Sequence, residues 1–430
     1  MTVADKIVPE LRFPEFEEDW RRKPLKALSS KSISYGIVQT GAPVEDGVKC
    51  VRVVDLTKPR IDFNELITTS EKISQSYKKT ILAANEIMVA LRGEIGLVAA
   101  VPKELEGSNL TRGIARIAPK GSEVHSSYLL WALRSPEGRK EFNRQVNGSA
   151  LKEIPIGGLN KIPVQLTTLP EQRKIANFLT AVDGRIGQLI QKKALLEDYK
   201  KGVMQQLFTQ AIRFKDEVNC EARENALGCD QGNDFPDWEE NKLGEFLSFK
   251  NGYNAAKEQY GTGKKFINVL DIIENDYITY ERIIGEVDIP LKDFEKNEVK
   301  FGDILFQRSS ETREEVGQAN VYLDQTKTAT FGGFVIRGRP LTEFNPIFFN
   351  AILKTSKVRK DMTSRSGGST RYNIGQESLE VVTVKIPPSL PEQTKIANFL
   401  SAIDRKIESV ATQITETQTF KRGLLQQMFV

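Results

Sequence analysis

The side chains that usually carry catalysis are sparse in this 430-residue sequence. His125 is its only histidine and has no second metal ligand four residues further on, so neither a zinc site nor a histidine-activated nucleophile is expected. The glycine-rich segment 261–265 (GTGKK) lacks the earlier glycine and the hydroxyl residue after lysine that a phosphate-binding loop needs. We therefore expect no catalytic residue and no bound metal in this chain.

Polar side chains in the expected loops suggest a different chemistry, the recognition of nucleic-acid bases. Arginine, asparagine, glutamine and serine form hydrogen bonds with base edges, and lysine binds phosphates, when the loops of a rigid scaffold present them. For each of these residues, an ordinary solvated loop side chain is the alternative. The DNA-binding candidates are Tyr35, Gln39, Arg92, Arg112, Ser149, Lys152, Asn251, Tyr253, Arg308, Arg313, Arg365, Ser369, Arg371 and Tyr372.

The charge distribution is compatible with a polyanionic partner. Residues 21–168 hold 23 lysines and arginines against 14 acidic residues, whereas residues 239–389 hold 21 against 22. In the second region, six bases and one acid gather between Lys354 and Arg371. Binding of a polyanion explains this pattern, and so does a solvated surface.

A long internal repeat organises the chain. The pattern LPEQ-x-KIANFL occurs at Leu169–Leu179 and again, 221 residues later, at Leu390–Leu400. Over the 40 positions from Leu169 to Phe208, 18 residues are identical in the second copy. A weaker repeat, FPEF and FPDW, precedes each of the two divergent regions, so the chain is built as two modules.

Both copies of the repeat are predicted to be long helices. Pro170 and Pro391 lie in the first turn, where a missing N–H does no harm, and the apolar residues that follow are spaced four and three apart, which is typical of a coiled coil. Lys193 and Lys200 interrupt the seam in the first copy. The expected pairing residues are Ile175, Leu179, Val182, Ile186, Leu189, Leu196, Ile396, Leu400, Ile403, Ile407, Val410 and Ile414. Because two copies in one chain are related by a two-fold axis only when they run in opposite directions, we expect an antiparallel pair about 57 Å long.

The divergent regions have the composition of mixed α/β domains. Residues 51–56, 86–91 and 113–118 have the β-branched content of strands, and residues 127–146 have helical spacing interrupted at Ser135–Pro136. The predicted fold is therefore α+β, with two mixed α/β domains separated by an antiparallel two-helix coiled coil made from the two repeats. The predicted boundaries are 1–168 for the first domain with its lead-in, 169–212 for the first helix, 213–234 for a linker, 235–389 for the second domain and 390–430 for the second helix.

Composition suggests a cytoplasmic protein. There is no apolar run of about 18 residues and no signal-peptide pattern at the beginning of the sequence. Cys50, Cys220 and Cys229 lie at unrelated spacings, so we expect free thiols and not a disulfide framework or a metal site.

With these features in place, the chain resembles the specificity subunits of type I restriction-modification systems. The resemblance rests on the two LPEQ-x-KIANFL copies, the endings KKGVMQQLF and KRGLLQQMF, the two lead-ins and the two divergent regions of similar length. It implies two target-recognition domains, each of which reads one half of a bipartite, asymmetric site in double-stranded DNA. It also implies that the conserved helices set the spacing and dock the partners.

The same resemblance implies that this subunit is not an enzyme and holds no cofactor of its own. Two modification subunits would bind S-adenosylmethionine and methylate adenine, and two restriction subunits would use ATP and Mg²⁺; no membrane is involved. Two alternatives stay open from the sequence: a fused methyltransferase or nuclease, and a structural coiled-coil protein that binds no DNA.

Overall fold

The chain divides into two compact units that share both long helices. The computed structural model describes residues 8–58, 61–148, 151–216, 233–368 and 370–429. The first unit consists of Met1–Lys192 and Val410–Val430, and the second of Lys193–Ser409. Each unit therefore contains one half of each repeat helix, and the linear domain boundaries stay a prediction.

The first unit contains two small sheets, one of which shares a core cluster with the beginning of the helix α6. One sheet has four antiparallel strands in the order β2-β8-β5-β6, and the other has the order β4-β3-β7, with β3 and β7 parallel. A short antiparallel pair, β1 and β9, joins the lead-in to the strand that precedes α6. The elements of this unit are β1 (Arg21–Pro24), β2 (Ser34–Tyr35), β3 (Val48–Val51), α1 (Val53–Leu56), β4 (Ile67–Thr69), α2 (Glu71–Ser76), β5 (Ile87–Ala90), β6 (Val98–Ala100), β7 (Asn109–Leu110), β8 (Ile114–Ile117), α3 (Ser126–Arg134), α4 (Pro136–Arg144), α5 (Ile156–Lys161), β9 (Pro163–Leu166) and the first part of α6 (Leu169–Phe208).

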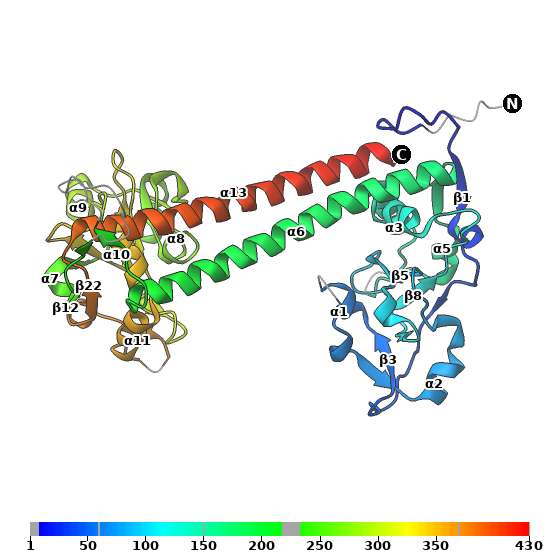
Figure 1. The fold of residues 1–430 in the computed structure, drawn as a ribbon, viewed down its shortest axis with the longest axis horizontal. Coiled ribbons are helices and arrows are strands. Elements are labelled where there is room, and N and C mark those ends of the chain that lie inside the picture. The colour runs from blue at the N-terminus through cyan, green and yellow to red at the C-terminus, as the bar shows by residue number, and fades with distance from the viewer. Residues whose placement is uncertain (1–7, 59–60, 149–150, 217–232, 369, 430) are drawn as a thin grey trace, which may run out of the picture. The chain divides into compact units, whose positions relative to one another are not determined.

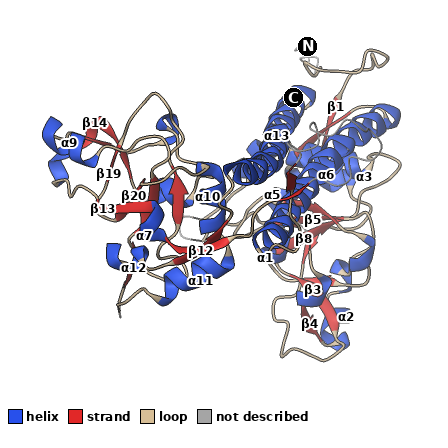
Figure 2. Ribbon diagram, turned by 60° about the vertical axis from the view of Figure 1, so that its left-hand side comes forward, coloured by secondary structure: helices blue, strands red, loops and turns tan. Residues whose placement is uncertain are grey.

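The second unit repeats the three sheets of the first unit and has two further strand pairs, β10-β11 and β17-β21. Its four-stranded sheet has the order β13-β20-β16-β18, its three-stranded sheet has the order β15-β14-β19, and β12 pairs with β22. The helix α3 packs on β6 in the first unit, and α10 packs on the equivalent strand β18 in the second. Figure 2 shows the strands of each unit in red and the helices in blue. The elements are β10 (Lys215–Asp216), β11 (Asn233–Asp234), β12 (Glu239–Lys242), α7 (Leu243–Phe246), β13 (Leu247–Asn251), β14 (Tyr260–Ile267), α8 (Val269–Ile273), β15 (Glu286–Val287), α9 (Leu291–Asn297), β16 (Ile304–Gln307), β17 (Ser309–Ser310), β18 (Ala319–Val321), β19 (Thr330–Phe331), β20 (Val335–Pro340), α10 (Pro346–Leu353), α11 (Ser356–Ser364), β21 (Tyr372–Asn373), α12 (Gln376–Glu380), β22 (Thr383–Ile386) and the first part of α13 (Leu390–Met428).

One predicted strand is wrong and one predicted break is confirmed. The run 51–56 is not a strand beyond Val51, because the backbone N–H of Arg52 donates to the Asp55 carboxylate at 2.8 Å and starts the helical turn α1. The helical segment 127–146 is split where expected. Ser135 caps α4 by accepting a hydrogen bond from the N–H of Gly138, so α3 ends one residue before it.

The two repeat helices pair in antiparallel fashion, as the contacts inside each unit show (Figure 1). In the first unit, Ile175 and Leu179 near the start of α6 share a core cluster with Leu424 near the end of α13. In the second unit, Leu207 near the end of α6 shares a cluster with Leu400 near the start of α13. Most predicted seam residues are buried, and the half-buried ones are Val182, Leu196, Ile407 and Ile414.

Two of the lysines that interrupt the seam are paired across it, whereas Lys193 pairs with Glu197 of its own helix at 2.9 Å. Lys200 of α6 forms an ion pair with Asp404 of α13 in the second unit. At the equivalent positions of the first unit, Lys421 of α13 forms an ion pair with Asp183 of α6. Lys200 and Lys421 therefore specify the register of the two helices, since each of them meets its carboxylate only in this alignment.

Two arginines lock the lead-in segments onto the helix starts, and the sequence analysis did not identify them. Arg12 makes a two-pronged contact of 2.8 Å with the buried carboxylate of Glu171. Arg213 contacts the equally buried Glu392 at 3.0 and 3.1 Å. A short sequence repeat marks both arginines: Leu-Arg-Phe at residues 11–13 recurs as Ile-Arg-Phe at residues 212–214. The predicted linker 213–234 includes Arg213, and residues 217–232 of it lie outside the described residues.

In the part of the chain that the structure describes, no helix has the length and apolar character required to cross a membrane.

Candidate nucleic-acid interface

Four loops meet in the first unit, and we call them the first loop cluster. Backbone hydrogen bonds hold them together: the N–H of Arg112 donates to the carbonyl of Ile37 at 2.8 Å, and that of Leu91 to Gly113 at 2.7 Å. The N–H of Ile154 donates to the carbonyl of Leu91 at 3.0 Å. The loops that make up this cluster are residues 35–39, 91–93, 111–113 and 147–153, of which 149–150 lie outside the described residues.

A glycine permits the closest of these approaches. A Cβ atom at Gly36 would stand 2.0 Å from the carbonyl oxygen of Leu110, a distance at which no side chain fits. At the equivalent place in the second unit, a Cβ atom at Gly252 would stand 2.1 Å from the carbonyl oxygen of Gly332. The same glycine-dependent contact thus joins two loops in both units.

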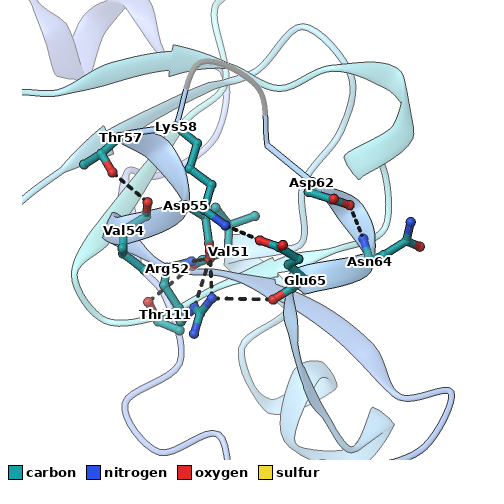
Figure 3. A network of polar contacts seen from close by, with 10 residues as sticks. All are labelled: Val51, Arg52, Val54, Asp55, Thr57, Lys58, Asp62, Asn64, Glu65 and Thr111. Carbon is teal, nitrogen blue, oxygen red and sulfur yellow. Dashed lines mark hydrogen bonds and ion pairs between the residues drawn. The ribbon is translucent and has the colours of Figure 1, made fainter. Parts of the chain in front are cut away.

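A polar network contacts the first loop cluster at Thr111 (Figure 3). The guanidinium of Arg52 donates to both oxygens of Asp55, at 2.8 and 3.0 Å, and this bonding raises the pKa of Arg52. Beside it, the hydroxyl of Thr111 donates to the carbonyl of Val51 at 3.2 Å. Thr111 is the first residue of the loop 111–113. Its hydrogen bond to Val51 therefore fixes the backbone from which the side chain of Arg112 projects.

The second unit assembles an equivalent second loop cluster. The N–H of Tyr253 donates to the carbonyl of Phe331 at 2.9 Å, and that of Arg308 to Phe334 at 2.9 Å. The N–H of Ile374 donates to the carbonyl of Arg308 at 3.0 Å, as Ile154 does to Leu91 in the first unit. This cluster comprises residues 251–254, 307–310, 332–334 and 367–373, of which 369 lies outside the described residues.

Two of the predicted DNA-binding arginines are committed to ion pairs within their own unit. Arg92 pairs with Glu153 across the first loop cluster. Arg365 donates to Asp361, one turn earlier in the same helical segment, at 2.9 Å. These guanidinium groups have carboxylate partners, so they are poorer candidates for contacts to bases than the sequence suggested.

Two further arginines of the second unit bind backbone carbonyls. Arg308 donates to the carbonyl of Gly333 at 3.3 Å, and Arg313 donates to that of Thr363 at 3.1 Å. Thr363 lies at the end of α11, where carbonyl groups lack helical partners, so Arg313 acts as a cap for that helix.

The two predicted tyrosines of the second unit are also partly engaged. The hydroxyl of Tyr253 accepts a hydrogen bond of 3.1 Å from the amide of Gln259. Tyr372 is half-buried and packs against the main core cluster of its unit. Ser149 and Ser369 lie outside the described residues.

The remaining candidates are exposed on the two loop clusters or next to them. Their side chains form no hydrogen bond or ion pair with another described residue. They are Tyr35, Gln39, Arg112 and Lys152 in the first unit and Asn251 and Arg371 in the second.

The basic segment 354–371 of the second unit is largely used for internal contacts. Arg359 donates to the carbonyl of Val316 at 2.7 Å, and Lys357 forms an exposed ion pair with Glu240 at 3.3 Å. Of the six bases in this segment, Lys360 and Arg371 have no such contact with the described residues. Its net charge therefore overstates what the segment offers to a polyanion.

The comparisons with known proteins bear on both modules. The family model "Type I restriction modification DNA specificity domain" matches residues 32–198 and again residues 236–418. The chain belongs to the family of type I restriction-modification specificity subunits. Such subunits determine the DNA target of their system, and the exposed loop residues are therefore candidates for DNA contacts.

Individual relatives agree with this assignment. The chain is 25% identical over 96% of its length to the putative type I restriction enzyme MjaX specificity subunit of Methanocaldococcus jannaschii, and the match covers 93% of that protein. It is 29% identical to the EcoBI specificity subunit of Escherichia coli, over 37% of this chain and 34% of that one. The crystal structure of the S subunit from M. genitalium shares the fold, with a TM-score of 0.56 over 99% of each chain and 16% identity.

Proposed function

We propose that each unit reads one half of a bipartite, asymmetric DNA site, in the cytoplasm, and that the paired helices hold the two readers at a set spacing. The observation that carries this proposal is that the units have the same strand order and the same loop contacts but different exposed side chains. Two copies of one scaffold with different contact residues suit a site with two different halves.

Equivalent positions in the two loop clusters illustrate the difference. Gly148 and Gly368 both have positive φ angles, of +94° and +129°, and a Cβ atom at either would stand within 2.3 Å of the carbonyl oxygen three residues later. Three residues later the first unit exposes Leu151, whereas the second exposes Arg371. An arginine can form paired hydrogen bonds with guanine, and a leucine has only apolar contacts to offer, so the two turns recognise different base pairs.

The helices are suited to act as spacer and dock. Forty residues in α6 extend about 60 Å at 1.5 Å per residue, which exceeds one turn of DNA, about 34 Å. In the second unit, α6 exposes Leu195 and Tyr199, one turn apart, with 62% and 53% of their surface accessible. We infer that this exposed apolar pair contributes to a protein-docking surface on the helices. In this proposal two modification subunits dock on the helices, and two restriction subunits join them in the full complex.

Catalysis belongs to those partners in this proposal. S-adenosylmethionine would bind to the modification subunits, and ATP with Mg²⁺ to the restriction subunits. The part of the chain that the structure describes contains no cluster of three or more metal-binding side chains. An assay of the purified chain with labelled S-adenosylmethionine should detect no methyl transfer to DNA until the modification subunit is added.

The spacing role has a direct test. Insertion of four residues after Ile190, in α6, should change the number of unread base pairs between the half-sites and leave both half-sites as they were. Sequencing of methylated adenines in cells that carry each version of the gene measures both quantities. Altered half-sites, or an unchanged spacer, contradict the proposal. A gel shift at graded salt tests DNA binding itself, because contacts to phosphates make the affinity salt-dependent.

A further inference from the structure

The second unit has an open cavity at a place where the first unit is filled by its own tryptophan. The cavity has a volume of about 730 Å³ and is lined by the end of α6, the start of α13 and the helices α10 and α11. This volume lies in the range of pockets that hold small ligands or side chains.

The two units can be aligned here through a pair of aromatic contacts. In the first unit, the rings of Tyr128 and Phe429 lie 5.5 Å apart at 44°. In the second, the rings of Phe348 and Phe208 lie 5.6 Å apart at 43°. Tyr128 of α3 therefore corresponds to Phe348 of α10. Three residues further along each helix, Trp131 corresponds to Ala351.

In the first unit, Trp131 is inserted between the two long helices. It is 2% exposed, and its indole N–H donates to the hydroxyl of Thr180 at 3.1 Å. The ammonium group of Lys421 lies 4.7 Å from the centre of the indole and also pairs with Asp183. The ring is thus held by a cation above it and a hydroxyl at its edge.

The second unit keeps these surroundings and lacks the ring. Lys200 and Asp404 form the ion pair that Lys421 and Asp183 form in the first unit, and Ser401 retains the hydroxyl of Thr180. The position of the tryptophan is taken by Ala351, which lines the cavity. Tyr277 approaches from another loop, donates to Asp404 at 2.9 Å and packs against the core of the unit, so its ring covers part of the tryptophan's place and the cavity lies beside it.

The chain has no aromatic residue left over to fill this space from its undescribed parts. Residues 1–7, 59–60, 149–150, 217–232, 369 and 430 include no phenylalanine, tyrosine or tryptophan. None of these segments can therefore supply an aromatic ring to fill the cavity, so we look for that ring in another molecule. Lys201 and Lys385 line the cavity, are exposed and form no ion pair with another described residue, which favours acidic groups beside that ring.

We propose that this cavity is a docking site for an aromatic side chain, flanked by acidic residues, of a partner protein that binds along the conserved helices. The partner's ring packs against Ala351, in the part of the tryptophan's place that Tyr277 leaves open. The two units therefore differ at this place. The first unit has its own aromatic side chain, Trp131, and the second unit binds an aromatic side chain of the partner. The inference rests on the proposed function only in that a protein is expected to dock on these helices.

The test uses the full chain and two probes, 5-fluoroindole and a short acidic peptide with one central tryptophan. Fluorine NMR should show saturable binding of 5-fluoroindole to the wild-type chain, and the peptide should displace it. Ala351→Trp should weaken probe binding at least about tenfold, because the new side chain fills the cavity. Lys360→Trp, which places a tryptophan on an exposed position of α11 outside the cavity, should leave binding unchanged. Trp131→Ala should create a second site in the first unit.

Three results would overturn the inference. They are the absence of saturable probe binding, binding that Ala351→Trp does not weaken, and binding of 5-fluoroindole that the acidic peptide cannot displace, which would mark a small-molecule site. Sedimentation of the wild-type chain and Ala351→Trp covers a further case: self-association that the substitution abolishes would assign the ring to a second copy and contradict a different partner. DNA binding is measured on the same samples, so that loss of the proposed function is seen separately from loss of the docking site.

Discussion

Lys200 and Asp404 form an ion pair between the two long helices of the second unit, with 25% and 15% of their side-chain surfaces exposed. Asp404 also accepts a hydrogen bond from Tyr277. A lysine in an apolar seam lowers the stability of the helix pair unless it forms an ion pair with a carboxylate. The pair therefore selects one register of the helices over registers shifted by a turn.

Removal of this carboxylate should destabilise the second unit. Asp404→Asn is expected to lower the free energy of unfolding by about 1–3 kcal/mol, because it leaves Lys200 without its counter-charge. This loss lies between those typical of exposed and of buried ion pairs. Urea denaturation measures the change. Asp183→Asn is the matched control: Asp183 is 42% exposed, so the same loss should be about 1 kcal/mol or less. Equal losses at the two sites would contradict this account.

The lead-in arginines should contribute more. Arg213→Met leaves the buried carboxylate of Glu392 without its guanidinium, and we expect a loss of about 3–5 kcal/mol. Trp238 donates to the same carboxylate at 3.1 Å, so its fluorescence reports the opening of this site in denaturant. Arg12→Met should have a similar effect on the first unit, where Arg12 binds Glu171. A loss below about 1 kcal/mol for Arg213→Met would mean that the contact is only peripheral.

Substitution of glycine by alanine should change the stability in opposite directions in the loops and in the helix. Gly36→Ala forces a Cβ atom against the carbonyl oxygen of Leu110 and should destabilise the first unit by about 2 kcal/mol or more. Gly184→Ala in α6 meets nothing within 4 Å and should stabilise the chain by about 1 kcal/mol, since alanine favours helix. Thermal unfolding of both variants checks the signs. Stabilisation by Gly36→Ala would refute the close approach of the two loops.

Arg371 should contribute directly to DNA affinity. Arg371→Ala is expected to weaken binding by about 1–3 kcal/mol if the guanidinium reads a base, and to reduce the salt slope by about one if it binds a phosphate. Fluorescence anisotropy at several salt concentrations separates these cases. Arg365→Ala is the control, because Arg365 is paired with Asp361 in the same part of the unit. If the control weakens DNA binding as much as Arg371→Ala does, the exposed arginine has no special role.

The single histidine offers a clean pH measurement. Burial lowers the pKa of His125 from its ordinary value, and the positive charge of Arg173 lowers it further. Since the folded state then binds fewer protons than the unfolded state, the contribution of His125 to stability is present above the unfolded pKa and is lost as the pH falls through the folded one. In proton NMR, the Hε1 resonance of this imidazole should titrate with a midpoint below about 6.5. Arg173→Gln should raise that midpoint, and an unchanged midpoint would exclude the charge effect.

Periodic and repeated features could be predicted from the sequence because local physics dictates them. The start of each long helix, the seam and the antiparallel pairing all follow from the repeat, since a helix with an apolar stripe must bury it against a partner. The break at Ser135–Pro136 was predictable for a similar reason, because proline restricts its predecessor. The 51–56 segment was not, because its composition suggests a strand, whereas the Asp55 carboxylate captures the backbone and turns it into a helix.

The sequence alone determined the two-module architecture, the family and the set of polar loop residues. Only the tertiary structure decided which of those residues are available. Arg92 and Arg365 read like Arg112 and Arg371 in the sequence, yet the first two have carboxylate partners and the last two project from their loops. The physical reason is that a guanidinium binds whichever acceptor the fold brings within reach, and residues distant in the chain supply that acceptor. The Arg12–Glu171 contact, across 159 positions, and the cavity beside Ala351 depend in the same way on packing that no local pattern records.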